Sequence, residues 1–187
     1  VGSEMCIRDR CSLFLCPIKH EYTTENQSEL ISRLKNIGLL DEAIKDRKNA
    51  YLTGDRFLNH VAYMGCAPAI QFEPADDNSD YCHINLHFYD SARLIYNKAR
   101  CRAPHCPRCH KPVDDWREQL SAAEIYCQQC QSHSPVDTIE WKKTAGYARL
   151  FIEITDVYPK EAIPQTALLE RLSTLSNTQW RYFYSCQ

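Results

Sequence analysis

Apolar and polar residues alternate along two segments of the chain, residues 81–89 and 148–154, which is the pattern of half-buried strands. Shorter apolar segments at 13–15 and 180–184 predict a buried strand near the start and an aromatic-rich strand at the end. A further strand is expected at 69–72, paired with 81–89 in a hairpin across an acidic, turn-rich stretch. Together these segments predict a small antiparallel or mixed sheet.

Apolar residues recur at helical spacing in other parts of the chain. One helix is expected to begin at Glu29 and end at Gly38, and a short charged helix is expected between Asp41 and Lys48. Residues 57–64 have the length and spacing of a buried helix, and Thr166 can cap a last helix that is rich in leucine. The fold class predicted from these patterns is α+β, with helices packed on the sheet.

Composition supports one soluble globular domain. The 187 residues are 44% hydrophobic and 25% charged, and no apolar run approaches the roughly 20 residues that a membrane span needs. Residues 1–10 resemble a translated sequencing adapter, so residues 11–187 are expected to form a single α+β domain. On that interpretation the native N-terminus is missing, and a signal peptide is not excluded.

Four of the eleven cysteines form two Cys-x-x-Cys pairs separated by seventeen residues: Cys106 with Cys109, and Cys127 with Cys130. Four thiolates at this spacing can surround one metal ion tetrahedrally, and zinc is the usual occupant, with iron of rubredoxin type as the alternative. Catalytic zinc generally keeps one coordination position open, whereas four cysteines leave none. The spacing therefore predicts one structural Zn²⁺.

The two pairs resemble the knuckles of a zinc ribbon, a small β fold. The resemblance covers residues 102–136 and implies that the four cysteines are the ligands. Pro107 suits the first knuckle, but His110 and Gln131 stand where many knuckles have a glycine. Because the segment interrupts the strand pattern, it is expected to be a module inserted between two strands of the sheet.

Other chemistry is possible for these and neighbouring residues. The cysteine pairs could be redox-active dithiols, although no thioredoxin-like βαβ pattern surrounds them. His105, His110 or Cys101 could replace one ligand. On one strand, His83 and His87 would be about 13 Å apart at ~3.3 Å per residue, too far to share an ion. His60, in an apolar run, is expected to be a hydrogen-bonded core residue.

The formal net charge of −2 disfavours a globally basic nucleic-acid-binding protein. A local basic cluster could still contact phosphates, with Tyr96 or Trp116 available for base stacking, or it could be a solvated rim that offsets the anionic thiolate site. The cluster consists of Lys98, Arg100, Arg102, Arg108 and Lys111. The six scattered cysteines outside the adapter-like segment and the metal pattern are expected to be buried thiols, which favours the cytoplasm.

No Gly-rich phosphate loop, nucleophile elbow or His-Glu-x-x-His helix is present in the sequence. The leading hypothesis is therefore a noncatalytic zinc-binding protein whose four-cysteine site stabilises a surface for a protein partner, with no membrane partner. Two alternatives stay open. One is RNA or DNA binding through the basic cluster, and the other is a small enzyme with a pocket near Cys66 beside the histidines of the adjoining sheet.

Overall fold

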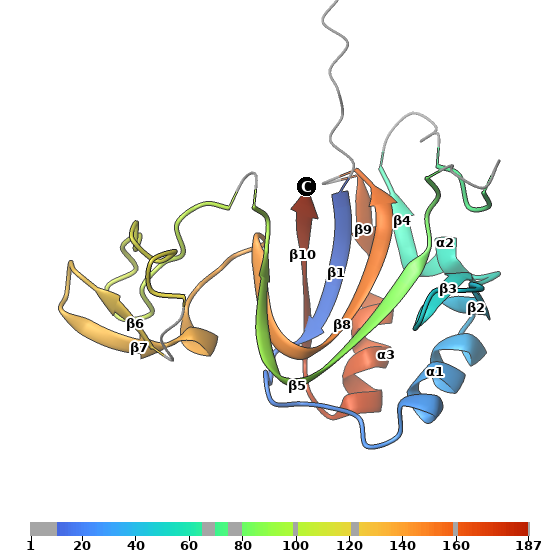
Figure 1. The fold of residues 1–187 in the computed structure, drawn as a ribbon, viewed down its shortest axis with the longest axis horizontal. Coiled ribbons are helices and arrows are strands. Elements are labelled where there is room, and N and C mark those ends of the chain that lie inside the picture. The colour runs from blue at the N-terminus through green and yellow to red at the C-terminus, as the bar shows by residue number, and fades with distance from the viewer. Residues whose placement is uncertain are drawn as a thin grey trace, which may run out of the picture.

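The computed structural model describes residues 11–64, 70–74, 80–98, 101–120, 124–158 and 161–186. Its largest sheet contains β1 (Cys11–Pro17), β2 (Leu40–Ala43), β3 (Ala50–Thr53), β5 (Ile84–Tyr96), β8 (Ala145–Val157) and β10 (Trp180–Cys186). The strands are antiparallel neighbours in the order β10-β1-β8-β5-β3-β2 (Figure 1). Two small sheets pair β4 (Val61–Tyr63) with β9 (Ala162–Pro164), and β6 (Glu124–Cys127) with β7 (Ser132–Pro135).

Three α-helices, α1 (Gln27–Asn36), α2 (Phe57–His60) and α3 (Thr166–Ser176), and one 3₁₀ helix, η1 (Val136–Thr138), complete the described elements. Helices α1 and α3 lie on the same side of the large sheet (Figure 1). Their buried leucines join the inward-facing residues of β1 and β8 in the main hydrophobic core. None of the helices in the described ranges has the length and apolar character needed to cross a membrane.

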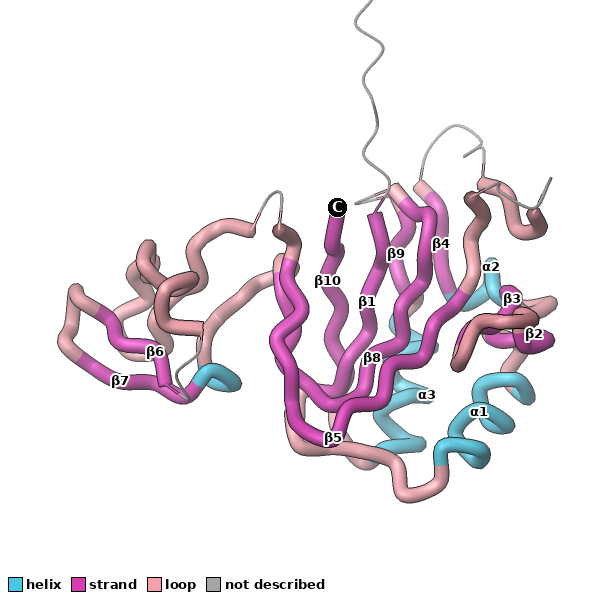
Figure 2. Tube along the Cα trace, in the orientation of Figure 1, coloured by secondary structure: helices cyan, strands magenta, loops and turns pink. Residues whose placement is uncertain are grey.

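The opposite face of the sheet carries a second buried cluster because β5 and β8, thirteen residues each, bend strongly (Figure 2). Their pairing shifts register between Phe88 and Arg93, and beyond this bulge the two strands curl back toward β10. The Ser185 hydroxyl donates to the Tyr96 carbonyl at 3.2 Å. The curl covers a small aromatic core that contains Phe14, Cys16, Ala148, Phe151 and Phe183.

The alternating and apolar segments at 13–15, 81–89, 148–154 and 180–184 lie largely in β1, β5, β8 and β10, as predicted, and the mixed content of helix and strand agrees with the α+β class in outline. Helices α1 and α3 are also where the leucine spacing predicted them. Asn26 caps α1, since its side chain accepts a hydrogen bond from the Glu29 amide at 3.0 Å. Gln165, rather than Thr166, is the N-cap residue of α3.

Three local predictions were wrong. The charged segment 41–48 forms no helix: its start lies in β2, which pairs with β3, and Asp46 is in the left-handed conformation. In 57–64 only α2 is helical, because the next three residues pair with β9. Residues 70–72 are not in a strand, while Ala69 lies outside the described residues, and β5 pairs with β3 and β8 instead of forming the expected hairpin.

The expectation that the scattered cysteines are all free thiols was also wrong. Cys11 and Cys186 form a disulfide that joins the start of β1 to the end of β10. Cys16, Cys82 and Cys101 are buried free thiols, as predicted, and Cys66 lies outside the described residues. Disulfides persist mainly in oxidising compartments, so this bond weakens the sequence argument for the cytoplasm.

Candidate metal centre

The cysteine-rich segment, defined here as residues 101–144, lies between β5 and β8 in the chain and to one side of the large sheet (Figure 1). It has a hydrophobic cluster of its own. At its centre Trp116 and Trp141 are fully buried and pack edge to face, with ring centroids 5.0 Å apart. Tyr96 of β5 packs on Trp116 at 5.1 Å, so the cluster is continuous with the curled end of the sheet.

Two turns of the same backbone shape present the four cysteines. In the first turn the His110 amide donates to the Cys106 carbonyl at 2.9 Å, and in the second the Gln131 amide donates to the Cys127 carbonyl at 2.8 Å. His110 and Gln131 have φ of 56° and 58°, the left-handed conformation that glycine adopts most easily. His110 and Gln131 therefore form the turn that a glycine would form, at a higher energetic cost.

The four sulfur atoms form a compact cluster in which each lies within 4.8 Å of every other. Across the two turns, the Sγ atoms of Cys106 and Cys130 are 3.7 Å apart, and those of Cys109 and Cys127 are also 3.7 Å apart. A tetrahedral Zn–S distance of about 2.3 Å gives sulfur–sulfur edges of about 3.8 Å. The four cysteines are therefore positioned to bind one metal ion.

Hydrogen-bond donors surround the sulfur atoms. The Arg108 amide donates to Cys106 Sγ at 3.4 Å, and the Ser132 hydroxyl lies 3.0 Å from Cys130 Sγ. Burial raises the pKa of Cys106, but backbone amides of Cys109 and Arg108 favour its thiolate and bring the pKa down to about 6. The bond from Ser132 likewise lowers the pKa of Cys130. At Cys109 the Lys111 amide lowers the pKa, but burial and the neighbouring sulfur atoms outweigh it and raise the pKa to about 11. The surroundings thus favour the thiolate, the form that binds metals, at Cys106 and Cys130.

The neighbouring ligand-type residues make other contacts. His110 Nδ1 lies 3.2 Å from a Glu140 carboxylate oxygen, and the backbone of His105 pairs with that of Glu140. The Cys101 thiol lies 3.7 Å from the Thr144 hydroxyl. Within the described part of the chain, the group that could hold a metal ion consists of the four cysteines and includes none of these three residues.

The basic cluster is partly described. Lys98, Arg102, Arg108 and Lys111 are exposed, and none of these four forms an ion pair with a described residue, whereas Arg100 lies outside the described ranges. Trp116 was expected to be available for base stacking, but it is fully buried, so this expectation was wrong.

The histidines singled out in the sequence lie elsewhere. His60 is buried, and its Nε2 lies 2.8 Å from the Ile37 carbonyl, which confirms the predicted core role. His83 Nδ1 is 2.9 Å from the Thr155 hydroxyl, and His87 Nε2 is 2.8 Å from Glu153. Neither Glu153 nor Thr155 was singled out from the sequence. Both are polar positions of the alternating pattern that begins at residue 148, and this pattern predicts that they lie on the polar face of the strand.

No family model matches the chain, and no curated protein or solved structure is significantly similar to it. Fold and site define it as a mixed α and β protein with a four-cysteine cluster able to hold a metal ion.

Proposed function

We propose that this chain is a noncatalytic zinc-binding protein in which Cys106, Cys109, Cys127 and Cys130 hold one structural Zn²⁺. The supporting observation is the pair of 3.7 Å sulfur–sulfur distances across two turns of equal shape. Four thiolates fill the tetrahedral shell, so the ion has no position for a substrate.

Zinc would crosslink parts of the segment that are weakly connected otherwise. The β6–β7 hairpin has two strands of four residues, and such a hairpin is marginally stable in water by itself. Binding of structural zinc and folding of the surrounding chain are coupled, because the ligands are not assembled in the unfolded state. We therefore infer that the ion fixes the outer surface of the segment relative to its Trp116–Trp141 core.

The exposed surface of the segment suits a protein partner. Along the sequence, the exposed cations Arg108 and Lys111 are close to the exposed acids Asp114 and Glu118. The surface of the segment therefore carries both positive and negative charges. A nucleic-acid surface needs an excess of positive charge, and four bound thiolates with one Zn²⁺ add negative charge instead. We propose that the zinc-supported surface binds a protein.

Nucleic-acid binding is the second candidate, because the four described cations of the basic cluster are exposed and unpaired among the described residues. Salt-sensitive retention on RNA or DNA that is lost in the Arg102→Ala/Arg108→Ala variant would favour it over a protein partner.

Elemental mass spectrometry on protein purified without added metal tests the zinc site. We expect one zinc per chain in the wild type and in Cys101→Ser, the matched control for a buried thiol outside the cluster. Cys127→Ser should lose the zinc and melt at a lower temperature. Cobalt substitution should give the thiolate charge-transfer bands and intense visible bands of tetrahedral Co²⁺. Full zinc content and unchanged melting in Cys127→Ser would refute the four-cysteine ligand set. Iron in place of zinc in the wild type would refute the choice of zinc as the metal.

A further inference from the structure

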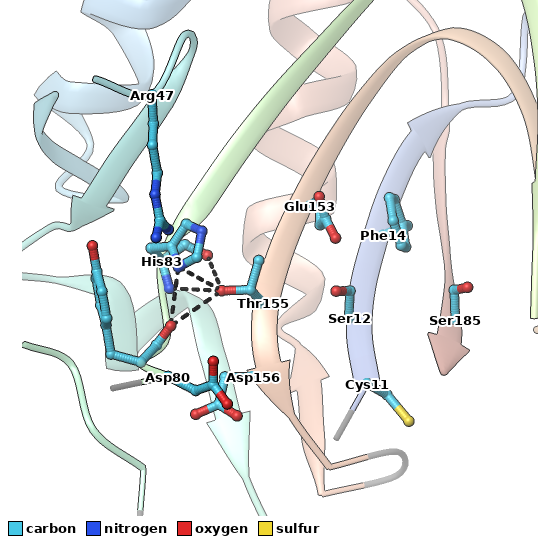
Figure 3. A pocket seen from close by; sticks show the side chains of 11 residues that line it. Cys11, Ser12, Phe14, Arg47, Asp80, His83, Glu153, Thr155, Asp156 and Ser185 are labelled. Atoms are coloured by element: carbon cyan, nitrogen blue, oxygen red, sulfur yellow. Dashed lines mark hydrogen bonds between the residues drawn. The ribbon is translucent and has the colours of Figure 1, made fainter. Parts of the chain in front are cut away.

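A polar cavity of about 250 Å³ opens on the side of the sheet opposite α1 and α3 (Figure 3). Ser12 of β1, Glu153 and Thr155 of β8 and Ser185 of β10 line it, together with His83 and with Arg47 from the β2–β3 connection. This is the end of the sheet where β5 begins and β8 ends, whereas the cysteine-rich segment joins their other ends. The cavity is therefore separate from the metal cluster.

Glu153 contributes a largely enclosed carboxylate to this cavity, with a side chain only 16% exposed. It accepts hydrogen bonds from the side-chain amide of Asn85 at 3.0 Å and from His87 Nε2 at 2.8 Å, and the Ser12 side chain is a further donor. Burial raises its pKa, but these donors outweigh burial and hold the pKa below its ordinary value. The result is an ionised carboxylate fixed in one orientation beside the cavity.

The charges around the cavity favour a positively charged ligand. Asp80 and Asp156 line it with Glu153, so the described lining residues include three carboxylates and one guanidinium, that of Arg47. Buried Phe14 and Tyr81 supply apolar wall, which suits a short alkyl chain. An alkylammonium group offers three N–H donors to carboxylates and hydroxyls, while an anion would lie against described lining residues that carry more acidic than basic groups.

We propose that this cavity binds a small aliphatic amine, with the Glu153 carboxylate accepting a hydrogen bond from the ligand's ammonium group. The amine can come from two sources, a simple diamine or an amino acid. Arg47 distinguishes them, because its exposed guanidinium at the cavity can pair with a carboxylate that only the amino acid carries.

Isothermal titration calorimetry on the zinc-loaded full chain tests the proposal with three probes: cadaverine, L-lysine and glutarate. Cadaverine should bind with one site per chain and glutarate should not bind. Glu153→Gln should weaken cadaverine binding about tenfold or more, the usual effect of losing a hydrogen bond to a charged group. Glu118→Gln, an exposed acid of the cysteine-rich segment, is the matched control and should leave binding unchanged.

Arg47→Gln separates the two sources. If L-lysine binds more tightly than cadaverine in the wild type and loses that advantage in Arg47→Gln, the ligand is an amino acid. If L-lysine binds no better than cadaverine in the wild type, the ligand is a simple amine. Should Glu153→Gln fail to fold, Asp156→Asn must weaken both amines. The proposal is overturned if neither amine gives saturable binding, if glutarate binds as well as they do, or if the folded cavity variants bind them as the wild type does.

Discussion

Gly146 lies where the curled ends of β5 and β8 close over the aromatic core, and it leaves no room for a side chain. A Cβ atom built on it would fall 2.8 Å from Cys16 Sγ and 3.0 Å from Phe183 Cδ1, and closer still to Phe183 Cε1. Its φ is not in the left-handed region, so alanine fits the backbone and any cost is steric. Cys16 and Phe183 are both fully buried, which prevents either from moving into solvent.

Gly146→Ala should therefore lower the free energy of unfolding by about 2–3 kcal/mol, the upper part of the range for adding a methyl group to a packed core. Urea unfolding followed by circular dichroism measures the change on zinc-loaded protein. Zinc content should stay that of the wild type, because Gly146 belongs to the sheet and the four cysteine ligands do not contact it.

Cys16→Ala supplies the internal control, since it removes one of the two side chains that the new methyl group would meet. In that background the cost of Gly146→Ala should fall by about 1 kcal/mol, an interaction energy typical of residues in contact. A cost below about 0.5 kcal/mol in the wild-type background, or the same cost with and without Cys16, would refute the close packing around Gly146.

Three further predictions concern the turns, the disulfide and Glu153. His110→Gly and Gln131→Gly should each stabilise the metal-loaded protein by up to about 1 kcal/mol in urea unfolding, because glycine relieves the left-handed strain; destabilisation would contradict the turn geometry. Cys186→Ser should cost about 2–5 kcal/mol under non-reducing conditions, since the disulfide joins residues 175 positions apart; an unchanged urea midpoint would argue against the bond. Glu153 has a pKa below 4.5 in the folded state, so its contribution is complete above that pH and disappears as pH falls through the folded pKa; Glu153→Gln should flatten this acid limb of stability measured against pH.

The parts of the fold that the sequence predicts are those set by local pattern. Both Cys-x-x-Cys turns close within five residues, and the alternation in β5 and β8 reflects one buried and one polar face. The wrong predictions involve pairing partners that the pattern within each segment does not specify. Strand β4 is three residues long and is fixed by β9, a hundred residues later, while the charged residues of β2 pair with β3 at the sheet edge. The cavity was missed for the same reason, because its lining comes from separate strands.

The stem of the cysteine-rich segment and the edge of the sheet depend on the same few contacts. The Asn97 amide donates to the Thr144 carbonyl at 3.0 Å, the Asn97 side chain reaches Cys186 Sγ at 3.4 Å, and the Tyr184 amide donates to the Lys143 carbonyl at 3.4 Å. If the metal ion holds the segment in place, its removal should release these contacts before it affects the centre of the sheet. Hydrogen exchange on chelator-treated protein should therefore show faster exchange at Asn97 and Tyr184, with protection kept where β1 pairs with β8. Equal loss of protection at Asn97 and between β1 and β8 would mean that the metal stabilises the whole domain as one unit. Unchanged protection at Asn97 would mean that the metal cluster does not stabilise the contacts that close the sheet.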